Sequence, residues 1–246
     1  MSATLEQPLD LVATNAVLET YDPPQVVAWA VKEFGTDLVM SSSFGAESAL
    51  LIHMATQVMP DIRIITVDTG YLFPETHEFM EDLQHRFHLN LWRYHTKNDP
   101  IAYLKEAGET EATVRIDRDR CCEVNKNEPF DRAMQKHQPK AWLRGIRRDQ
   151  STTRQDRKIV EWSKRFSLYA VSPLLNWSSR EIYRYMKQHD LPFHPLYEKG
   201  YASIGCNPTS CTRAITIGED PRAGRWAGTD KIECGLHLEE EGGSGI

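Results

Sequence analysis

The sequence predicts an α/β protein with a doubly wound, mostly parallel sheet. Short apolar and β-branched runs of strand length alternate with segments whose apolar residues recur at helical spacing. Polar turns follow several of these runs, and the length of 246 residues suits one large α/β domain. Alternation of strands and helices is typical of parallel sheets, because a crossover helix must carry the chain back before the next strand begins.

The first half of the chain supplies most of this alternation. Residues 37–40 form a short apolar run that predicts a buried strand, and residues 46–59 carry apolar side chains at helical spacing. A second β-branched run lies at 62–67. Pro74 suits the first position of the next helix, and residues 89–94 predict a third strand.

The second half contains fewer regular elements. Residues 141–146 predict a fourth strand, and Ser178 with Glu181 forms a capping box that begins a helix ending near His189. Beyond Leu191 prolines and glycines multiply, so no element is assigned there. We expect a helical extension over residues 1–30, an α/β domain over 31–211 and a C-terminal segment over 212–246.

Composition excludes several functional classes. The net charge of −6 argues against a nucleic-acid-binding protein, which is typically basic. No apolar run approaches the length of a membrane helix, and the N-terminus lacks a basic and apolar signal peptide. We therefore expect a cytoplasmic protein without membrane or nucleic-acid partners. Cysteines in that compartment are more often catalytic or metal-binding than disulfide-bonded.

Two polar loops follow the first two predicted strands. The first is SSSFGAES, residues 41–48, whose hydroxyls and backbone amides can cradle a phosphate. The second is residues 68–73, which would lie at the same edge of the sheet, where ligands of open α/β sheets bind. The loops match neither the P-loop nor the GxGxxG pattern. A polar turn with a serine N-cap is the alternative interpretation.

Arginines gather after the fourth predicted strand and in the C-terminal third. The first group is Arg144, Arg147, Arg148, Arg154 and Arg157, and the second is Arg213, Arg222 and Arg225. The planar guanidinium group pairs with phosphate and sulfate oxygens two at a time. A solvated surface is the alternative for each of these side chains.

Four of the five cysteines form two close pairs. Cys121 and Cys122 are adjacent, and Cys206 and Cys211 are separated by four residues. The second spacing suits zinc but the first does not, so an iron–sulfur cluster matches the two pairs better. Packing of buried thiols is the alternative.

The fifth cysteine stands alone in IECGLH, residues 232–237. Cys234 has Lys231 and His237 three residues away on either side, and nearby cations favour the nucleophilic thiolate. An unreactive thiol in the tail is the alternative interpretation.

Together these segments resemble the assimilatory sulfonucleotide reductases, which reduce adenosine 5′-phosphosulfate (APS) or its 3′-phosphorylated form (PAPS) to sulfite. The matching motifs are SSSFGAES, DTGYLFPET, CCEVNK, WLRGIRRDQS, YASIGC, CTRAI, RAGRWAG and IECGLH, in family order over residues 37–237. The resemblance implies a PP-loop adenine nucleotide α-hydrolase-like fold with a mobile C-terminal tail. It also implies a homo-oligomer.

The resemblance implies that Cys234 attacks the substrate sulfur, assisted by His237. The resulting S-sulfocysteine would be reduced by thioredoxin or glutaredoxin, which releases sulfite. The residues expected to bind substrate are Ser41, Ser42, Ser43, Phe44, Gly45, Asp68, Thr69, Gly70, Arg147, Arg148, Arg222 and Arg225.

In the APS branch of the family, a 4Fe–4S cluster is held by cysteines that match Cys121, Cys122, Cys206 and Cys211. Lys126 matches a family lysine near that cluster. The resemblance implies that the cluster tunes the electrostatics of the site and does not relay electrons to the substrate sulfur. Two features depart from this branch. The second pair is C-x₄-C, two residues longer than expected, and the SSSFG and DTGYLFPET loops resemble the cluster-free PAPS branch. We expect a cluster and APS, with PAPS or dual specificity as the alternative.

Two other functions are considered. A PP-loop enzyme that adenylates its substrate with ATP typically has SGGxDS where this chain has SSSFGAES. A non-catalytic iron–sulfur sensor that binds a nucleotide would need the cysteine pairs but not Cys234.

Overall fold

The fold is a single mixed sheet covered by helices on both faces. The computed structural model describes residues 9–97, 118–207, 211–216, 219–220, 222–229, 231 and 233–236. Within these residues the strand order is β3-β2-β1-β4-β6-β5, and only the β5–β6 pair is antiparallel. The strands are β1 (Leu38–Ser41), β2 (Arg63–Asp68), β3 (Asn90–His95), β4 (Ala141–Leu143), β5 (Val160–Ser163) and β6 (Leu168–Val171).

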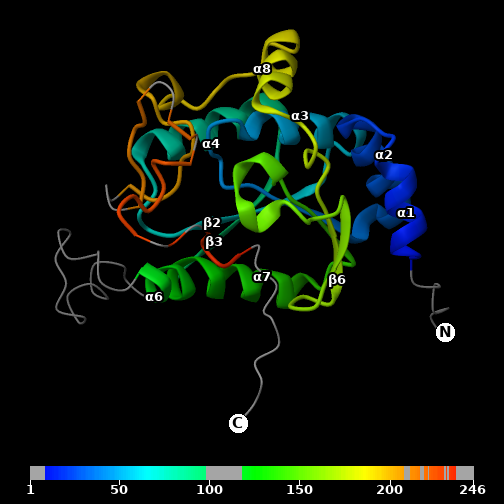
Figure 1. Ribbon diagram of the computed structural model, residues 1–246. Helices are drawn as coiled ribbons and strands as arrows, with labels where there is room; N and C mark the ends of the chain where they lie inside the picture. Colours follow the sequence, from blue (N-terminus) through cyan, green and yellow to red (C-terminus); the bar gives the residue numbers. More distant parts are fainter. Residues whose placement is uncertain are drawn as a thin grey trace.

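Two groups of helices cover the two faces of the sheet (Figure 1). The first group is α1 (Leu11–Leu18), α2 (Pro23–Phe34), α3 (Ser48–Val58), α4 (Pro74–Phe87) and α8 (Ser179–Gln188). The second group is α6 (Arg118–Cys122), the π-helical turn η2 (Glu123–Asn127) and α7 (Glu128–His137), which follow one another directly. Short 3₁₀ turns complete the described elements: η1 (Gly35–Asp37), η3 (Arg148–Gln150), η4 (Thr152–Arg154) and η5 (Tyr197–Lys199).

The alternation of side chains along the strands creates two separate cores. In β1, Leu38 and Met40 face the core shared with α2, α3 and α4, whereas Val39 faces the core shared with α7. The second core also contains Cys234 and Leu236, so part of the C-terminal segment packs against the sheet together with α7. The sheet therefore holds the candidate nucleophile on the α7 side.

The predicted doubly wound arrangement is confirmed. From β1 the chain moves outward to β2 and β3, then crosses to β4 on the other side of β1. This reversal creates a crevice at the carboxyl ends of β1 and β4, which is where ligands bind in open α/β sheets. The serine loop follows β1, and the arginine-rich loop follows β4.

Predicted and observed element boundaries agree within one or two residues for the first three strands and the helices between them. The fourth strand is shorter than predicted. It ends at Leu143, and after it the Arg144 N–H still donates to the Val171 carbonyl (2.9 Å). The chain then turns away from the sheet toward the crevice. Sequence reasoning did not predict the antiparallel β5–β6 hairpin or the helix α7.

The helical N-terminal extension expected over residues 1–30 corresponds to α1 and most of α2, which continues to Phe34. Leu18, Val27 and Ala30 are fully buried in the core on that face. No helix in the described ranges is long and apolar enough to cross a bilayer.

Candidate active site

A cavity of about 260 Å³ opens at the carboxyl edge of the sheet. Its walls come from the serine loop, the β2–α4 loop, the helix around η2, the loop after β4 and the C-terminal segment. The predicted site residues that line it are Ser41, Ser42, Ser43, Gly45, Thr69, Cys121, Cys122, Lys126, Arg147, Cys206, Cys211, Arg222, Arg225 and Cys234. The fold thus gathers segments that are far apart in the sequence.

The serine loop has an unusual backbone conformation at Phe44. This residue has φ of 48°, in the left-handed region, and its side chain is fully buried. Its N–H donates to Ser42 Oγ (3.1 Å), which stabilises the turn. A non-glycine residue in this region costs about 1–3 kcal/mol, and such residues cluster at functional sites. Because the Phe44 ring lies in the core, Ser43 and Gly45 on either side of it remain at the cavity wall.

In the second loop only one predicted residue reaches the cavity. Thr69 lines it, whereas Asp68 and Gly70 do not. The Asp68 carboxylate accepts the Gly70 N–H (2.8 Å) and lies within 4 Å of nitrogens of His77 and His95. Asp68 and Gly70 therefore shape the loop, and Thr69 is its contribution to the cavity.

The two arginines after β4 occupy different environments. Arg147 is buried at the cavity wall, where it pairs with Glu47 and Asp149. Arg148 does not line the cavity and pairs with Glu19. The structure therefore brings Arg147, but not Arg148, to the site.

Arg225 presents its charge to the cavity without a carboxylate partner among the described residues. Its guanidinium group donates to the carbonyls of Ile204 and Cys211 (both 3.2 Å) and lies 4.5 Å from the centre of the Trp226 ring. A Cβ at position 205 would collide with this guanidinium group, so Gly205 permits its close approach.

The helix that carries the first cysteine pair contains the π-helical turn η2. A π turn adds a residue to a helical turn and is frequent at functional sites. Here it lies directly after Cys122, and Asn125 and Lys126 within it line the cavity. The Asn125 amide donates to Cys121 Sγ (3.5 Å). The turn therefore presents an amide, an ammonium group and two thiols to one space.

The second cysteine pair reaches the same cavity from the C-terminal third. Cys206 forms a β-bridge with Leu72, and its sulfur lies 3.4 Å from Thr69 Oγ1. The Cys211 carbonyl accepts hydrogen bonds from Trp226 N–H and Arg225 Nε–H. The four cysteines that the sequence predicts as cluster ligands thus line one cavity.

The donor set fits an iron–sulfur group by its chemistry. Burial raises the pKa of Cys122 to about 12, so this thiol is neutral unless a metal ion stabilises its thiolate. Four thiols with a lysine nearby are typical of such clusters rather than of carboxylate-bound metals. Within the described ranges, no three histidine, cysteine or acidic side chains lie close enough together to hold a metal ion, so the four thiols share one cavity but are not placed as the ligands of one group.

Cys234 is buried at the cavity wall, with 8% of its surface exposed. Burial raises the pKa of its thiol, but the Lys126 ammonium, the Leu236 N–H and Arg225 outweigh this effect, so the pKa lies below its ordinary value. The negative charge of Cys234 in turn raises the pKa of Lys126. The two groups favour a thiolate–ammonium pair. His237, predicted to act with Cys234, lies outside the described residues.

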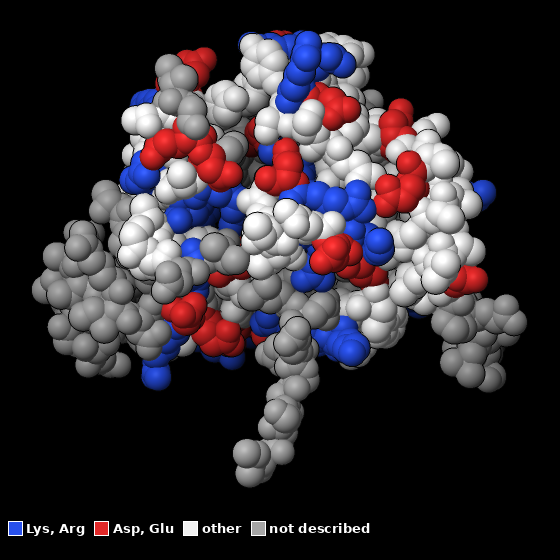
Figure 2. Space-filling model, in the orientation of Figure 1, with Lys and Arg blue, Asp and Glu red and all other residues white. Residues whose placement is uncertain are grey.

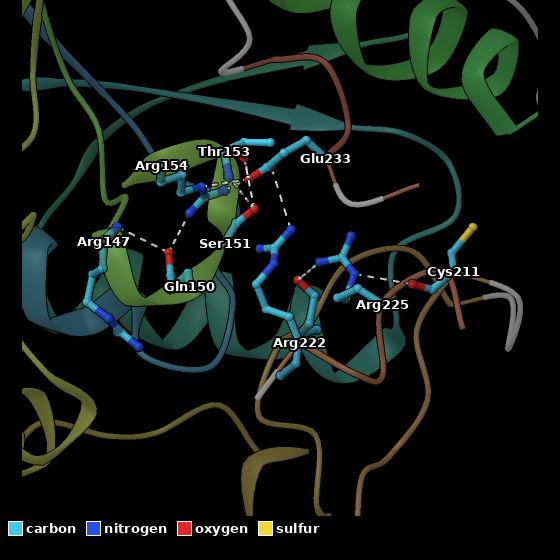
Figure 3. Close-up of polar contacts among 10 residues, drawn as sticks. Arg147, Gln150, Ser151, Thr153, Arg154, Cys211, Arg222, Arg225 and Glu233 are labelled. Atoms are coloured by element: carbon cyan, nitrogen blue, oxygen red, sulfur yellow. Dashed lines mark hydrogen bonds and ion pairs between the residues drawn. The ribbon is translucent and has the colours of Figure 1, made fainter. Parts of the chain in front are cut away.

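Sequence reasoning missed the residue beside the nucleophile. Glu233 is buried and lines the cavity. Arg154 donates to both of its carboxylate oxygens, from Nε to Oε1 (2.7 Å) and from Nη2 to Oε2 (2.9 Å), and Arg222 Nη2 lies 3.5 Å from Oε2. Figure 3 shows the two arginines pointing toward Glu233 from different segments. An acidic residue directly before a candidate nucleophile, in an arginine-rich chain, was the available signal.

The electrostatics of the site suit an anionic ligand. Figure 2 shows basic side chains gathered in a hollow on this face, bordered by acidic side chains. Basic side chains outnumber acidic ones in the cavity lining, and hydroxyls of the serine loop lie on its wall. The basic residues are Lys126, Arg147, Arg154, Arg222 and Arg225, and the acidic ones are Glu47 and Glu233, which pair with Arg147, Arg154 and Arg222. Such a cavity can bind phosphate or sulfonate groups and present them to a thiolate.

Comparison with known proteins gives consistent results. Residues 37–214 match the model of the phosphoadenosine phosphosulfate reductase domain. The chain is 42% identical to a phosphoadenosine 5′-phosphosulfate reductase of Synechococcus sp., covering 93% of this chain and 97% of the relative. It is 39% identical to an adenosine 5′-phosphosulfate reductase of Halalkalibacterium halodurans, covering 91% and 94%.

Solved structures support the same fold. The PAPS reductase of Candida auris in a phosphate complex has a TM-score of 0.70 at 24% identity, covering 84% of this chain and 98% of its own. The FMN adenylyltransferase of Candida glabrata has a TM-score of 0.57 at 17% identity, covering 87% and 71%. The predicted nucleotide α-hydrolase-like architecture is therefore confirmed. From the matched domain and the two relatives above 35% identity, the chain belongs to the phosphoadenosine phosphosulfate reductase domain family.

Proposed function

We propose that this protein reduces a sulfonucleotide to sulfite, with APS as the substrate and Cys234 as the nucleophile. The observation that carries the proposal is the buried Cys234 thiol at the wall of a cavity that is rich in hydroxyls and arginines and is also lined by Lys126. A thiolate facing an anion-binding cavity suits attack on a sulfonate, because the attacking group is negative and the leaving group gains negative charge.

In the first half-reaction the Cys234 thiolate attacks the sulfonate sulfur. A bond forms between Sγ and that sulfur, and the bond from sulfur to the bridging phosphate oxygen breaks. The electron pair of the broken bond leaves with the phosphate, so AMP is released and S-sulfocysteine remains. Lys126 and Arg225 favour this step, since both hold positive charge beside the reacting sulfur of Cys234.

In the second half-reaction a dithiol protein such as thioredoxin or glutaredoxin supplies two electrons. One of its thiolates attacks Cys234 Sγ, sulfite leaves, and the mixed disulfide is resolved by the second thiol. The products are sulfite, the oxidised dithiol protein and the free Cys234 thiol. A cytoplasmic protein fits this cycle, because that compartment keeps such dithiols reduced.

The remaining roles follow from the cavity lining. We assign the substrate phosphate and sulfonate oxygens to the serine loop, Thr69, Arg147, Arg222 and Arg225. His237 is assigned to the leaving group or the attacking thiol, as the family resemblance implies. Phe44, Asp68 and Gly70 act through the shape of the loops, and Arg148 has no direct part in this scheme, because it lies outside the cavity.

We further propose that Cys121, Cys122, Cys206 and Cys211 hold one 4Fe–4S cluster per chain. When bound, such a cluster would supply local charge and polarisability beside the substrate, rather than electrons for the reduction. The gathering of the four thiols at one cavity and the name of the Halalkalibacterium relative support this assignment.

A coupled assay tests the function and the substrate together. Anaerobically purified protein is mixed with reduced thioredoxin and either APS or PAPS, and sulfite release is measured. We expect faster release with APS and none from Cys234→Ser with either substrate. Faster release with PAPS would correct the substrate, and equal rates would indicate dual specificity. Absence of sulfite from both substrates would contradict the proposed function.

A further inference from the structure

The carboxylate of Glu233 is buried in the C-terminal segment and pairs with two arginines. Its side chain is 4% exposed. The Arg154 side chain, which is 7% exposed, donates hydrogen bonds to both carboxylate oxygens. Arg154 is held in turn by Gln150, whose side chain also accepts the Arg147 backbone N–H (3.2 Å). A continuous chain of contacts therefore runs from the loop after β4 to the residue beside the nucleophile (Figure 3).

A buried carboxylate destabilises a nearby thiolate, because the two negative charges repel each other. The charge of Glu233 raises the pKa of Cys234, which opposes the effect of Lys126. Glu233 thus does not activate the sulfur electrostatically. Its location and its partners instead point to a role in placing the segment.

The other side of Cys234 is held by weaker contacts. Arg165, which forms a bidentate pair with Asp131, donates to the Gly235 carbonyl at 3.3 Å. Cys234 therefore lies between a carboxylate clamp on the η3–η4 side and, on the α7 side, the contact of Arg165 with the Gly235 carbonyl together with apolar packing of Leu236. The clamp is the stronger of the two polar contacts, because it joins two opposite charges through two hydrogen bonds, whereas Arg165 donates one hydrogen bond to the uncharged Gly235 carbonyl.

We propose that Glu233 is the positioning residue that docks Cys234 over the cavity, through Arg154 and Arg222. Docking brings the thiol to the substrate for the first half-reaction. Release of the same clamp lets the S-sulfocysteine leave the cavity for reduction by the dithiol protein. The effects on formation and reduction of the S-sulfocysteine rest on the proposed function. The docking of Cys234 does not, because it can be measured without substrate.

The test compares Glu233→Gln with wild type in three measurements. The first is the rate at which iodoacetamide alkylates Cys234 without nucleotide, located by peptide mapping and followed over a range of pH. We expect a severalfold higher rate on the high-pH plateau, where ionisation is complete and only access differs. The second is single-turnover formation of the S-sulfocysteine, which we expect to slow roughly 10- to 100-fold, as misplaced reacting groups do. The third is removal of the preformed adduct by reduced thioredoxin, which we expect not to slow.

Three further variants complete the design: Glu219→Gln, Arg154→Gln and the double variant Arg154→Gln/Glu233→Gln. Glu219→Gln is the matched control, because Glu219 also pairs with an arginine, Arg213, but lies outside the cavity lining. We expect it to behave as wild type in all three measurements. The double variant Arg154→Gln/Glu233→Gln should be no slower in adduct formation than the slower of the two single variants, because both changes remove the same clamp.

Unchanged alkylation and unchanged adduct formation in Glu233→Gln would overturn the proposal. Equal slowing of both half-reactions would also overturn it, since that result indicates general damage rather than lost docking. If wild type forms no adduct but the difference in alkylation persists, the docking role stands and the proposed function fails.

Discussion

At the scale of single residues, the site depends on how one thiol is kept ionised in a buried place. Burial raises the pKa of Cys122 to about 12, although Lys126 opposes this effect, yet the pKa of Cys234, also buried, is lowered. Lys126 has the largest opposing effect on both thiols. At Cys234 the Leu236 N–H and Arg225 act in the same direction as Lys126, and together they outweigh burial.

Replacing Lys126 with methionine should raise the pKa of Cys234. Because the thiolate is the reactive form, the wild-type rate falls as the pH is lowered through the pKa of Cys234. In the variant this fall should begin at a higher pH, because the pKa is higher. We expect adduct formation at pH 7 to slow roughly 10-fold or more, with the gap narrowing as pH rises. The measurement is the pH dependence of single-turnover labelling. Lys136→Met, an exposed lysine on the same run of helix, is the control, and equal profiles for the two variants would contradict this account.

At the scale of elements, the C-terminal segment fits closely against the helix that carries the first cysteine pair. Gly235 has φ of 86°, and a Cβ there would lie 3.0 Å from Asn127 Nδ2, on the π-helical turn. The segment therefore needs glycine both for its backbone and for its contact with η2.

Gly235→Ala should move the segment away from η2 and slow adduct formation roughly 10-fold or more. The midpoint of thermal unfolding should fall only slightly, because the strands and α7 supply most of the second core. Gly228→Ala provides a matched control, since Gly228 has φ of 77° but nothing within 4 Å of its would-be Cβ. We expect a clearly smaller effect there, and equal rates for the two variants would show that the contact with Asn127 is unimportant.

Elements with strong local patterns were predictable from sequence, and those defined by tertiary contacts were not. Residues 46–59 and Pro74 carried helical spacing and a start signal, and their helices were found close to the expected bounds. The β5–β6 hairpin consists of two strands of only four residues each, which is too short for their pattern to distinguish a strand from a loop. Its place at the edge of the sheet is decided by pairing with β4, which no local pattern reveals.

The same distinction applies to the site. Motifs predicted the cavity-lining serines and cysteines, whereas nothing local distinguished Arg147, which faces the cavity, from Arg148, which pairs with Glu19. Adjacent side chains in an extended turn point in opposite directions, so a shift of one residue along the chain decides whether an arginine faces the cavity. Glu233 was missed because its function depends on Arg154, 79 residues earlier in the chain.

At the scale of the whole molecule, the sheet separates two cores and brings its carboxyl edge, the cysteine pairs and the C-terminal segment to one cavity. This arrangement suits a cycle in which a small anionic substrate binds at the edge of the sheet. In the proposed cycle, the segment that carries Cys234 serves both the cavity and an external dithiol protein.

The cluster assignment belongs to this scale, because its four cysteines come from two distant parts of the chain. We expect anaerobically purified protein to contain about four iron atoms and four acid-labile sulfides per chain. Cys211→Ser should lose most of both, since it removes one of the four proposed ligands. Full iron content in that variant, or none in wild type, would contradict the assignment.

The most direct test of the central claim is the intact mass of the protein after mixing with APS, or separately PAPS, without any dithiol protein. We predict a gain of one sulfonate group, which peptide mapping places on Cys234, and loss of that group when reduced thioredoxin is added. A sulfonate on another residue, or no adduct with either nucleotide in protein that holds its cluster, would contradict the account.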